Sequence, residues 1–177
     1  MALIKTNARS ASALDATILT GNLPALSGAN LTGVSAGKVL QVVSASHASQ
    51  ASTTSSSFQD VSSNLNISIT PSATSSKVLV MAHFNECFHS SSYNNQSHYL
   101  RVTADGSELH RMHTVYNAAG NGEKMVSQDF IIMHTTNTTS AVAYKLQFRS
   151  IHSGETVRIN QNSATGGTTI TLLEIGA

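Results

Sequence analysis

The sequence predicts an all-β fold, an antiparallel β-sandwich (jelly roll) of about 8–10 strands that follows an extended N-terminal arm. From Lys38 onward, short runs rich in Val, Ile, Thr, Phe and Tyr are separated by clusters of Ser, Asn, Gly and Thr, which is the pattern of strands joined by turns. No helical periodicity is sustained there. Residues 1–36 show no lasting alternation of either kind, so we expect them to form an arm.

The runs of strand length follow one another with turn signals between them. They cover residues 38–46, 56–61, 64–70, 77–87, 97–104, 108–115, 124–134, 141–149, 155–159 and 168–175. Pro71 ends the third run, where its missing N–H harms no ladder. Asp105 and Gly106 stand between two alternating runs and predict a two-residue hairpin turn of type I′.

Alternation along these runs predicts which faces are buried. In 141–149 every second residue is large and apolar and most of the residues between them are polar, so this strand is expected to have one wet face. The runs 77–84 and 168–175 are apolar on both faces. The residues of their second face are Leu79, Met81, Leu173 and Ile175. A sandwich has one inner face per sheet, so we expect this outer face to be covered, most simply by another copy of the chain.

The arm contains large apolar residues that it cannot bury alone. In the stretch 19–34, "LTGNLPALSGANLTGV", they stand between glycines and small polar residues. They are Leu19, Leu23, Leu26, Leu31 and Val34. We expect neighbouring chains to cover them, and the glycines permit the close backbone approach that such a junction requires.

Composition limits the function classes. The chain has 177 residues, enough for one domain and an arm. Charged residues make up 11% of it, against about 25% in most proteins, so hydroxyls and amides must form most of the solvated surface. The net charge is +1 and the ten Lys and Arg are scattered along the chain. These features argue against nucleic acid as a partner.

Targeting signals are also missing from the sequence. The first residues lack the uninterrupted apolar region of a secretory signal. No apolar run approaches the roughly 20 residues of a membrane helix. The single cysteine, Cys87, excludes an intramolecular disulfide. We therefore expect a protein that is made in a cytoplasm and does not insert into membranes.

Several segments together resemble a known family. They are "MALIKTNARS", "LPALSGANLTGV", "GKVLQVVSAS", "NISITPSATSSKVLV" and "TTITLLEIGA". The arrangement resembles the small fibre and spike proteins of tailed bacteriophages, especially marine and cyanobacterial ones. "LPALSGANLTG" is similar to the collar that joins stalk to head in trimeric phage fibres, and "ITPSATSSKVLV" to a recurrent segment of their β-sandwich heads.

The resemblance implies a homotrimer with two parts. Residues 1–36 would be the virion-anchoring arm and trimeric collar, whose interface is formed by the apolar residues of 19–34. Residues 37–177 would be a jelly-roll head similar to tumour-necrosis-factor-like knobs. The arm would dock on a capsid, portal-region or tail protein of the phage, and the protein would lie on the virion surface.

The eight histidines of the chain are candidate metal ligands. His83, Cys87 and His89 share parity on an extended strand, so they could project from one face, and sulfur with imidazole suits zinc. Same-face neighbours lie about 6.8 Å apart, however, and three ligands from one strand rarely converge on a tetrahedral ion. We predict no metal site, and His83, repeated at a threefold axis, is the one candidate ligand. His110 and His113 fall on opposite faces of a strand.

No catalytic residue and no cofactor is predicted. Serines and histidines are plentiful, but there is no G-x-S-x-G elbow, no carboxylate pair framed by a motif and no phosphate-binding loop before a helix. We predict that the chain is not an enzyme. A hydrolase of surface sugars is the remaining enzymatic alternative.

Two long polar segments, 87–98 and 116–124, are candidate recognition loops because aromatic rings and amides suit contact with sugars. The candidate receptor contacts are Phe88, Tyr93, Asn94, Asn95, Tyr116 and Asn117. The alternative is that these loops are solvated connections with no ligand.

Two structural roles follow from the sequence. The first is a homotrimeric short fibre or head fibre that is displayed on the virion and binds host surface glycan. The second is a capsid decoration or cement protein, in which the same trimer stabilises the head shell. The short distance between the arm and the head is compatible with both.

Overall fold

The computed structural model describes residues 38–90, 95–117, 124–152, 154–162 and 166–176. The described strands are β1 (Val39–His47), β2 (Ala51–Thr53), β3 (Gln59–Asp60), β4 (Ile67–Ile69), β5 (Lys77–Ser90), β6 (Asn95–Ala104), β7 (Ser107–Asn117), β8 (Lys124–Thr135), β9 (Val142–Ser150), β10 (Thr156–Ile159) and β11 (Thr168–Ile175). A single 3-10 turn, η3 (Ser63–Leu65), is the only helical element in these residues. The predicted arm lies outside the described residues, so the division at residue 36 stays a prediction.

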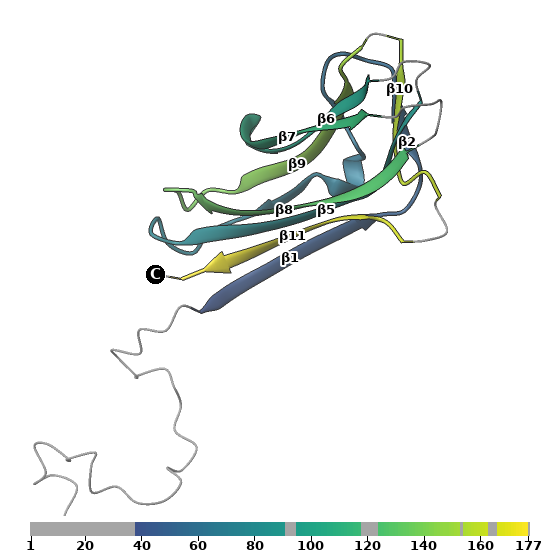
Figure 1. Ribbon diagram of the computed structural model, residues 1–177. Helices are drawn as coiled ribbons and strands as arrows, with labels where there is room; N and C mark the ends of the chain where they lie inside the picture. Colours follow the sequence, from purple (N-terminus) through teal and green to yellow (C-terminus); the bar gives the residue numbers. More distant parts are fainter. Residues whose placement is uncertain (1–37, 91–94, 118–123, 153, 163–165, 177) are drawn as a thin grey trace, which may run out of the picture. The chain divides into compact units, whose positions relative to one another are not determined.

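The strands form two antiparallel sheets that face each other (Figure 1). Sheet A has the order β1-β11-β5-β10-β2, and β8 pairs with the other edge of β5. Sheet B has the order β3-β9-β6-β7, with β4 also pairing with β9. Without the short strands β2, β3 and β10, the orders are β1-β11-β5-β8 and β4-β9-β6-β7. This is the double Greek-key order of a jelly roll, so the predicted fold class is confirmed.

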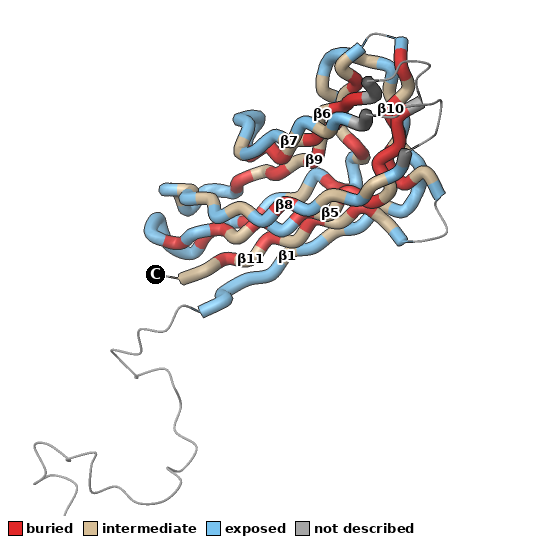
Figure 2. The backbone as a smooth tube through the Cα atoms, in the orientation of Figure 1, coloured by how far each residue is buried: buried red, intermediate tan, exposed pale blue. Residues whose placement is uncertain are grey.

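The core lies between the two sheets, where buried residues alternate with exposed ones along each strand (Figure 2). In β9, Val142, Tyr144, Leu146 and Phe148 are buried and the residues between them are half-buried, as the alternation predicts. Aromatic rings from both sheets fill the centre of the core. The largest fully buried side chains include Tyr144, Phe84, Phe88, Phe148, Leu65, Ile69, Leu100, Leu146, Ile170 and Leu172.

Two segments differ from the predicted strand pattern. The run 56–61 contains only the two residues of β3, and 64–70 is divided between η3 and β4. The reason is local capping: the side chain of Ser62 accepts a hydrogen bond from the backbone N–H of Asn64 at 3.2 Å and starts a turn there. The short strand β2 was not predicted, because three residues are too few to show alternation.

A β-bulge in β5 reverses which side chains point inward. Phe84 pairs with Gln128, but the next paired residue, Cys87, faces Val126, so β5 contains one extra residue between them. Glu86 at this bulge has a φ of 45°. Even-numbered residues point inward before the bulge and odd-numbered residues point inward after it. His83 therefore points to the opposite face of β5 from Cys87 and His89, although all three residue numbers are odd.

The hairpin between β6 and β7 has the predicted type I′ turn, with φ of 47° at Asp105 and 81° at Gly106. We expect Gly106→Ala to lower the free energy of unfolding by about 1–2 kcal/mol, because an L side chain is strained at this φ. A Cβ there would meet nothing within 4 Å, so the effect isolates backbone strain. Urea unfolding of Gly106→Ala beside Ser107→Ala measures it. Equal midpoints for these two variants would contradict the assignment.

Candidate functional site

The outer face of sheet A carries a continuous apolar surface. The strand register places Val42, Leu173, Leu79 and Met133 side by side across β1, β11, β5 and β8. Residues in the neighbouring pairs on the same face extend this row in both directions along the strands. The surface, called the outer apolar patch below, consists of Val39, Val42, Leu79, Met81, Ile131, Met133, Leu173 and Ile175.

Five of the eight side chains of the patch are exposed in the described part of the chain, and Leu79, Leu173 and Ile175 are half-buried. Ile131 is 70% exposed, Val42 58% and Met133 52%. Four strands about 4.8 Å apart and rows about 6.8 Å apart give the patch roughly 14 by 14 Å between outer Cα positions. Single exposed apolar residues are common on soluble proteins, but a contiguous patch of this kind marks a contact surface. The outward position of Leu79 and Leu173 agrees with the sequence prediction.

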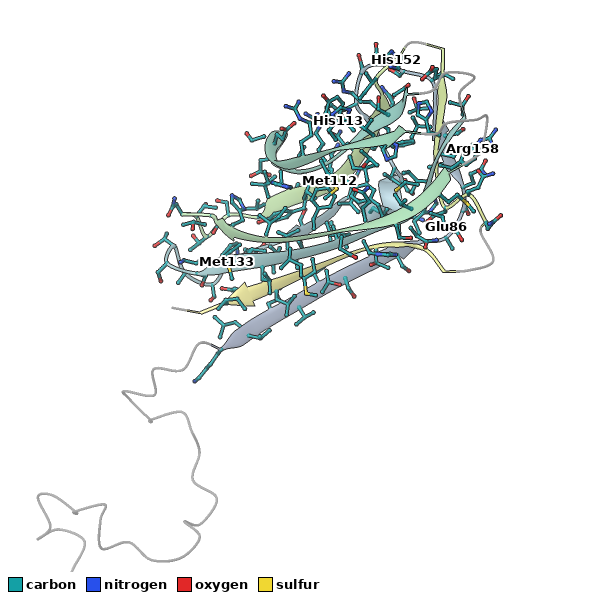
Figure 3. The ribbon with its side chains drawn as sticks, in the orientation of Figure 1. Glu86, Met112, His113, Met133, His152 and Arg158 are labelled. Carbon is teal, nitrogen blue, oxygen red and sulfur yellow. The ribbon has the colours of Figure 1, made fainter. Side chains whose placement is uncertain are left out.

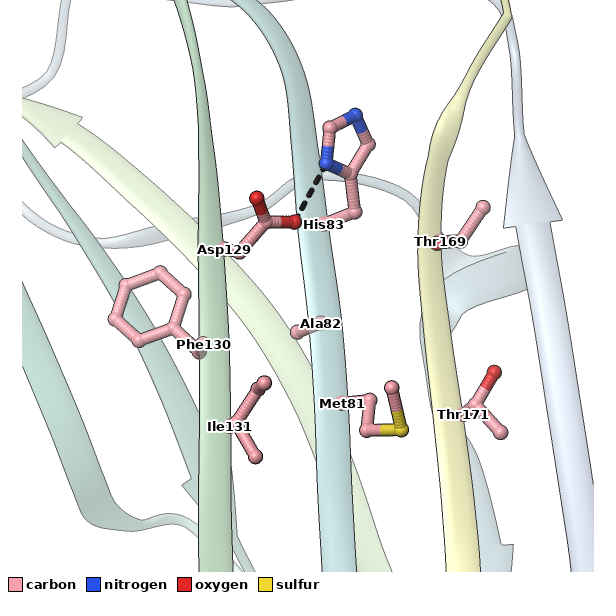
Figure 4. Close-up of a pocket in the computed structure, with 8 residues that line it drawn as sticks. All are labelled: Met81, Ala82, His83, Asp129, Phe130, Ile131, Thr169 and Thr171. Carbon is pink, nitrogen blue, oxygen red and sulfur yellow. Dashed lines mark hydrogen bonds and ion pairs between the residues drawn. The ribbon is translucent and has the colours of Figure 1, made fainter.

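An open depression of about 290 Å³ lies in this face, over β11, β5 and β8 (Figure 4). Its lining includes Met81, His83, Asp129, Ile131, Thr169 and Thr171. His83 Nδ1 and Asp129 Oδ1 are 2.8 Å apart and form a cross-strand pair. Figure 4 shows this pair at one end of the depression, with Met81 and Ile131 below it. The depression therefore joins the apolar patch to a polar rim.

The polar rim of this face includes the pair of His83 with Asp129. His83 has one carboxylate neighbour, and the described residues contain no group of three His, Cys, Asp or Glu side chains that could hold a metal ion. Within the same residues, no serine, threonine or cysteine is hydrogen-bonded to His83. A histidine and an aspartate without a nucleophile in reach do not form a catalytic triad.

Cys87 and His89, the other metal candidates, lie inside the sandwich and away from His83. Burial raises the pKa of the Cys87 thiol, which keeps it in its neutral form. Burial also lowers the pKa of His89, an effect that Glu155 opposes from 3.1 Å away. The prediction that these three residues could share a face is therefore wrong, and the bulge in β5 is the cause.

The predicted receptor contacts are only partly described. Phe88 lies in β5 with 1% exposure, and the guanidinium of Arg158 covers its ring at 5.4 Å. It is a buried residue of the chain and not part of a surface loop, because β5 continues beyond the predicted end of the strand at 87. Asn95 pairs with Asn117 where β6 starts and β7 ends, and Tyr116 is in the adjacent pair.

The two candidate loops therefore connect to neighbouring strand ends of sheet B, which the sequence could not show. Tyr93 and Asn94 lie outside the described residues. So do all the predicted interface residues of the arm, which are Leu19, Leu23, Leu26, Leu31 and Val34. Their roles stay predictions.

Sequence reasoning missed the contribution of β8 to the patch. Ile131 and Met133 lie two residues apart in "FIIMH", so their shared face could be inferred from alternation. Their position beside Met81 and Leu79 depends on the pairing of β8 with β5. The sequence of one strand does not show which other strand it pairs with. For the same reason, the pair of His83 with Asp129 could not be predicted from the sequence.

None of the helices formed by the described residues is long and apolar enough to cross a membrane. The chain matches no protein-family model and no curated protein sequence.

The matches among solved structures include VP2 proteins of infectious bursal disease virus. A mutant VP2 protein in derived particles has 15% identity and a TM-score of 0.35 over 76% of this chain and 36% of that one. The VP2 subviral particle has 14% identity and a TM-score of 0.35 over 77% of this chain and 38% of that one. The chain thus spans less than half the length of these VP2 chains. Similarity at this level does not identify a function.

Proposed function

We propose that this chain is a virion structural protein of a tailed bacteriophage, a homotrimeric short fibre or head fibre on the particle surface. The observation that carries the proposal is the outer apolar patch, an open apolar face on a domain that already has a complete core. The resemblance of the segments around residues 19–34 and 67–80 to phage fibre collars and heads supports it. A second copy of the chain is the occupant that we assign to the patch.

The chemistry of the patch suits a copy of the same chain. Its centre carries no charge, and its rim is formed by Lys77, Thr135 and the pair of His83 with Asp129. Interfaces between subunits have this anatomy, with an apolar centre and a polar rim. A charged partner such as nucleic acid would find no complementary group in the centre.

The size of the patch suggests that it does not act alone. An area of roughly 400 Å² per copy, at about 25 cal/mol per Å², gives roughly 10 kcal/mol of gross stabilisation. Association costs about 4–15 kcal/mol in lost translational and rotational freedom. The two terms are comparable, so a stable trimer needs a further interface. We assign that role to the apolar residues of 19–34.

The arm therefore gives a direct test. We expect the double variant Leu23→Ser and Leu26→Ser to weaken the trimer and virion attachment before it affects the fold of the head, because the described residues of the head form a hydrophobic core among themselves. Sedimentation velocity measures the first effect and limited proteolysis the second. Leu3→Ser is the control for trimer content, because it lies in the arm but outside the stretch 19–34. Loss of head resistance to protease at unchanged trimer content would contradict the assigned role.

A capsid decoration protein is the second candidate, because the arm joins the head without a long stalk. Decoration proteins cover the capsid lattice, whereas fibres occupy a few vertices or the tail. Quantifying copies per particle separates the two: on the order of hundreds of copies favours decoration and tens favour a fibre. Absence of the protein from purified particles would overturn both.

A further inference from the structure

The outer face of sheet B carries a cluster of charged side chains, in contrast to the apolar outer face of sheet A. The described residues contain eight Lys and Arg side chains, and four of them lie on this one face. They are Arg101 in β6, Arg111 in β7, and Lys145 and Arg149 in β9. The carboxylates beside them are Asp60 and Glu108. Four cations and two carboxylates leave +2 on this face, although the whole chain has a net charge of +1.

Aromatic rings hold these guanidinium groups in place. The Cζ of Arg101 lies 3.8 Å from the centre of the Phe58 ring, and that of Arg149 lies 5.1 Å from it. Arg149 and Arg111 also flank Tyr99, at 4.6 and 5.2 Å from its ring centre. The result is a ladder of alternating cations and rings across three strands.

The ladder ends on the edge strand of the sheet. His113 stacks on Tyr99 with ring centres 4.6 Å apart. Figure 3 labels His113 on β7 and Met133 on β8, which belong to different sheets. The charged face and the outer apolar patch are thus separate surfaces of the same sandwich.

The positive groups are only partly neutralised by the chain itself. Arg101 and Arg111 share the single carboxylate of Glu108, at 3.3 and 3.5 Å. Arg149 donates a hydrogen bond to the backbone carbonyl of Ser56 at 2.7 Å, and no carboxylate among the described residues pairs with it. The hydroxyl of Tyr99 likewise makes no hydrogen bond within this part of the chain.

Stacked guanidinium groups are well prepared to bind carboxylates. Stacking occupies the flat face of the group and leaves its in-plane N–H donors for bonds to a carboxylate. In Arg149 these donors are on the Nη atoms, because its Nε is buried. The ring fixes the side chain beforehand, so less conformational entropy is lost on binding. A tyrosine hydroxyl beside two such groups adds a donor and acceptor that suits sugar hydroxyls.

We propose that the outer face of sheet B binds a carboxylate-bearing saccharide through Arg111, Arg149 and Tyr99. This goes beyond the proposed function, because it uses a different surface and does not require a trimer. Single-stranded nucleic acid fits less well: bases need free aromatic faces for stacking, and here the guanidinium groups and His113 already cover Tyr99. An open sheet face also suits weak binding that repeated copies on a particle would strengthen.

Binding of the full chain to polygalacturonate, a polymer of uronic acid, tests the proposal. Dextran serves as the neutral polymer and a short single-stranded DNA as the other anion. The variants are Arg149→Gln and Arg111→Gln, and the half-exposed side chain of Arg111 can be replaced without opening a cavity. Arg158→Gln is the matched control, since Arg158 also stacks on a ring, that of Phe88, but lies in sheet A. Melting temperatures of all variants are measured alongside.

The wild type is expected to bind polygalacturonate and not dextran, with affinity that falls as salt is raised. Arg149→Gln and Arg111→Gln should each weaken binding by about tenfold or more, while Arg158→Gln retains it. Three results would overturn the proposal: no binding by the wild type, an equal loss in Arg158→Gln, or equally tight binding of DNA with the same pattern of losses. None of these three results bears on the virion copy number or the trimer mass. The proposal of saccharide binding can therefore fail while the proposed virion role stands, and the reverse.

Discussion

Ile131→Asp is expected to convert the protein from a trimer to a monomer at micromolar concentration. The side chain stands on the outer face of β8, 70% exposed in the single chain, and belongs to the outer apolar patch. In a trimer each copy would bury one unpaired carboxylate, at a cost of at least about 3 kcal/mol each. In the monomer the aspartate stays in water, so the free energy of unfolding should change by only about 1 kcal/mol.

Val115→Asp is the matched control for this change. Val115 is 53% exposed and lies on β7, on the outer face of sheet B opposite Ser97. The two variants introduce the same charge at similarly exposed strand positions on different sheets. Sedimentation velocity should show dissociation of Ile131→Asp alone. An intact Ile131→Asp trimer would remove the patch from the interface, and dissociation of both variants would point to a general effect of charge.

Mild acid is expected to destabilise the head domain through its buried histidines. His98 is fully buried in β6, and burial, together with the nearby His89 and His113, lowers its pKa to about 3 from an ordinary value of 6.5. The unfolded chain takes up this proton near pH 6.5 and the folded chain does not. Stability is therefore fully present above pH 6.5 and is lost as the pH falls toward 3.

The expected loss from His98 between pH 7 and pH 5 is about 2 kcal/mol, at about 1.4 kcal/mol for each pH unit below 6.5. The lowered pKa of His89 acts in the same direction. The pKa values of Asp60 and Glu174 are also lowered. The stability that these two carboxylates contribute is lost mainly below pH 5, outside the range between these two pH values. Urea unfolding at the two pH values measures the total.

A pair of variants isolates the histidine. His98→Leu should reduce the difference in unfolding free energy between pH 7 and pH 5, whatever its effect on stability at pH 7. Val102→Ala removes buried apolar atoms from the same strand but no titratable group, so it should lower stability equally at both pH values. A His98→Leu protein that keeps the full pH dependence would show that another group is responsible.

Much of the fold could be predicted because it depends on local patterns. In β9 the alternation of Tyr144, Leu146 and Phe148 with polar residues identifies the inner face without any knowledge of the partner strand. The type I′ turn follows from Asp105 and Gly106 alone. Both features depend on residues next to each other in the chain, where sequence and geometry are directly linked.

The candidate sites could be predicted only in part because they depend on strand pairing. Leu79 and Met81 indicated an apolar outer face, but the patch takes its width from β8 and β1. One extra residue at Glu86 reversed the parity of β5 and separated His83 from Cys87. Nothing in the sequence marks that bulge, since Glu is not a residue that favours a positive φ.

The charged face of sheet B also depends on strand pairing and could not be predicted from the sequence. Arg101, Arg111 and Arg149 are scattered along the sequence and read there as isolated charges. The antiparallel register of β7, β6 and β9 brings them around Tyr99. A search for basic runs in the sequence cannot find a cluster of this kind, because each strand contributes only one or two of its members.

The most direct test of the central claim is the mass of the intact wild-type protein in native buffer at micromolar concentration. The chain has a mass of 18.6 kDa. The proposed assembly, with the outer apolar patch covered by other copies, predicts a single species with three times that mass. A species with the mass of one chain, stable in solution with its patch open, would contradict it.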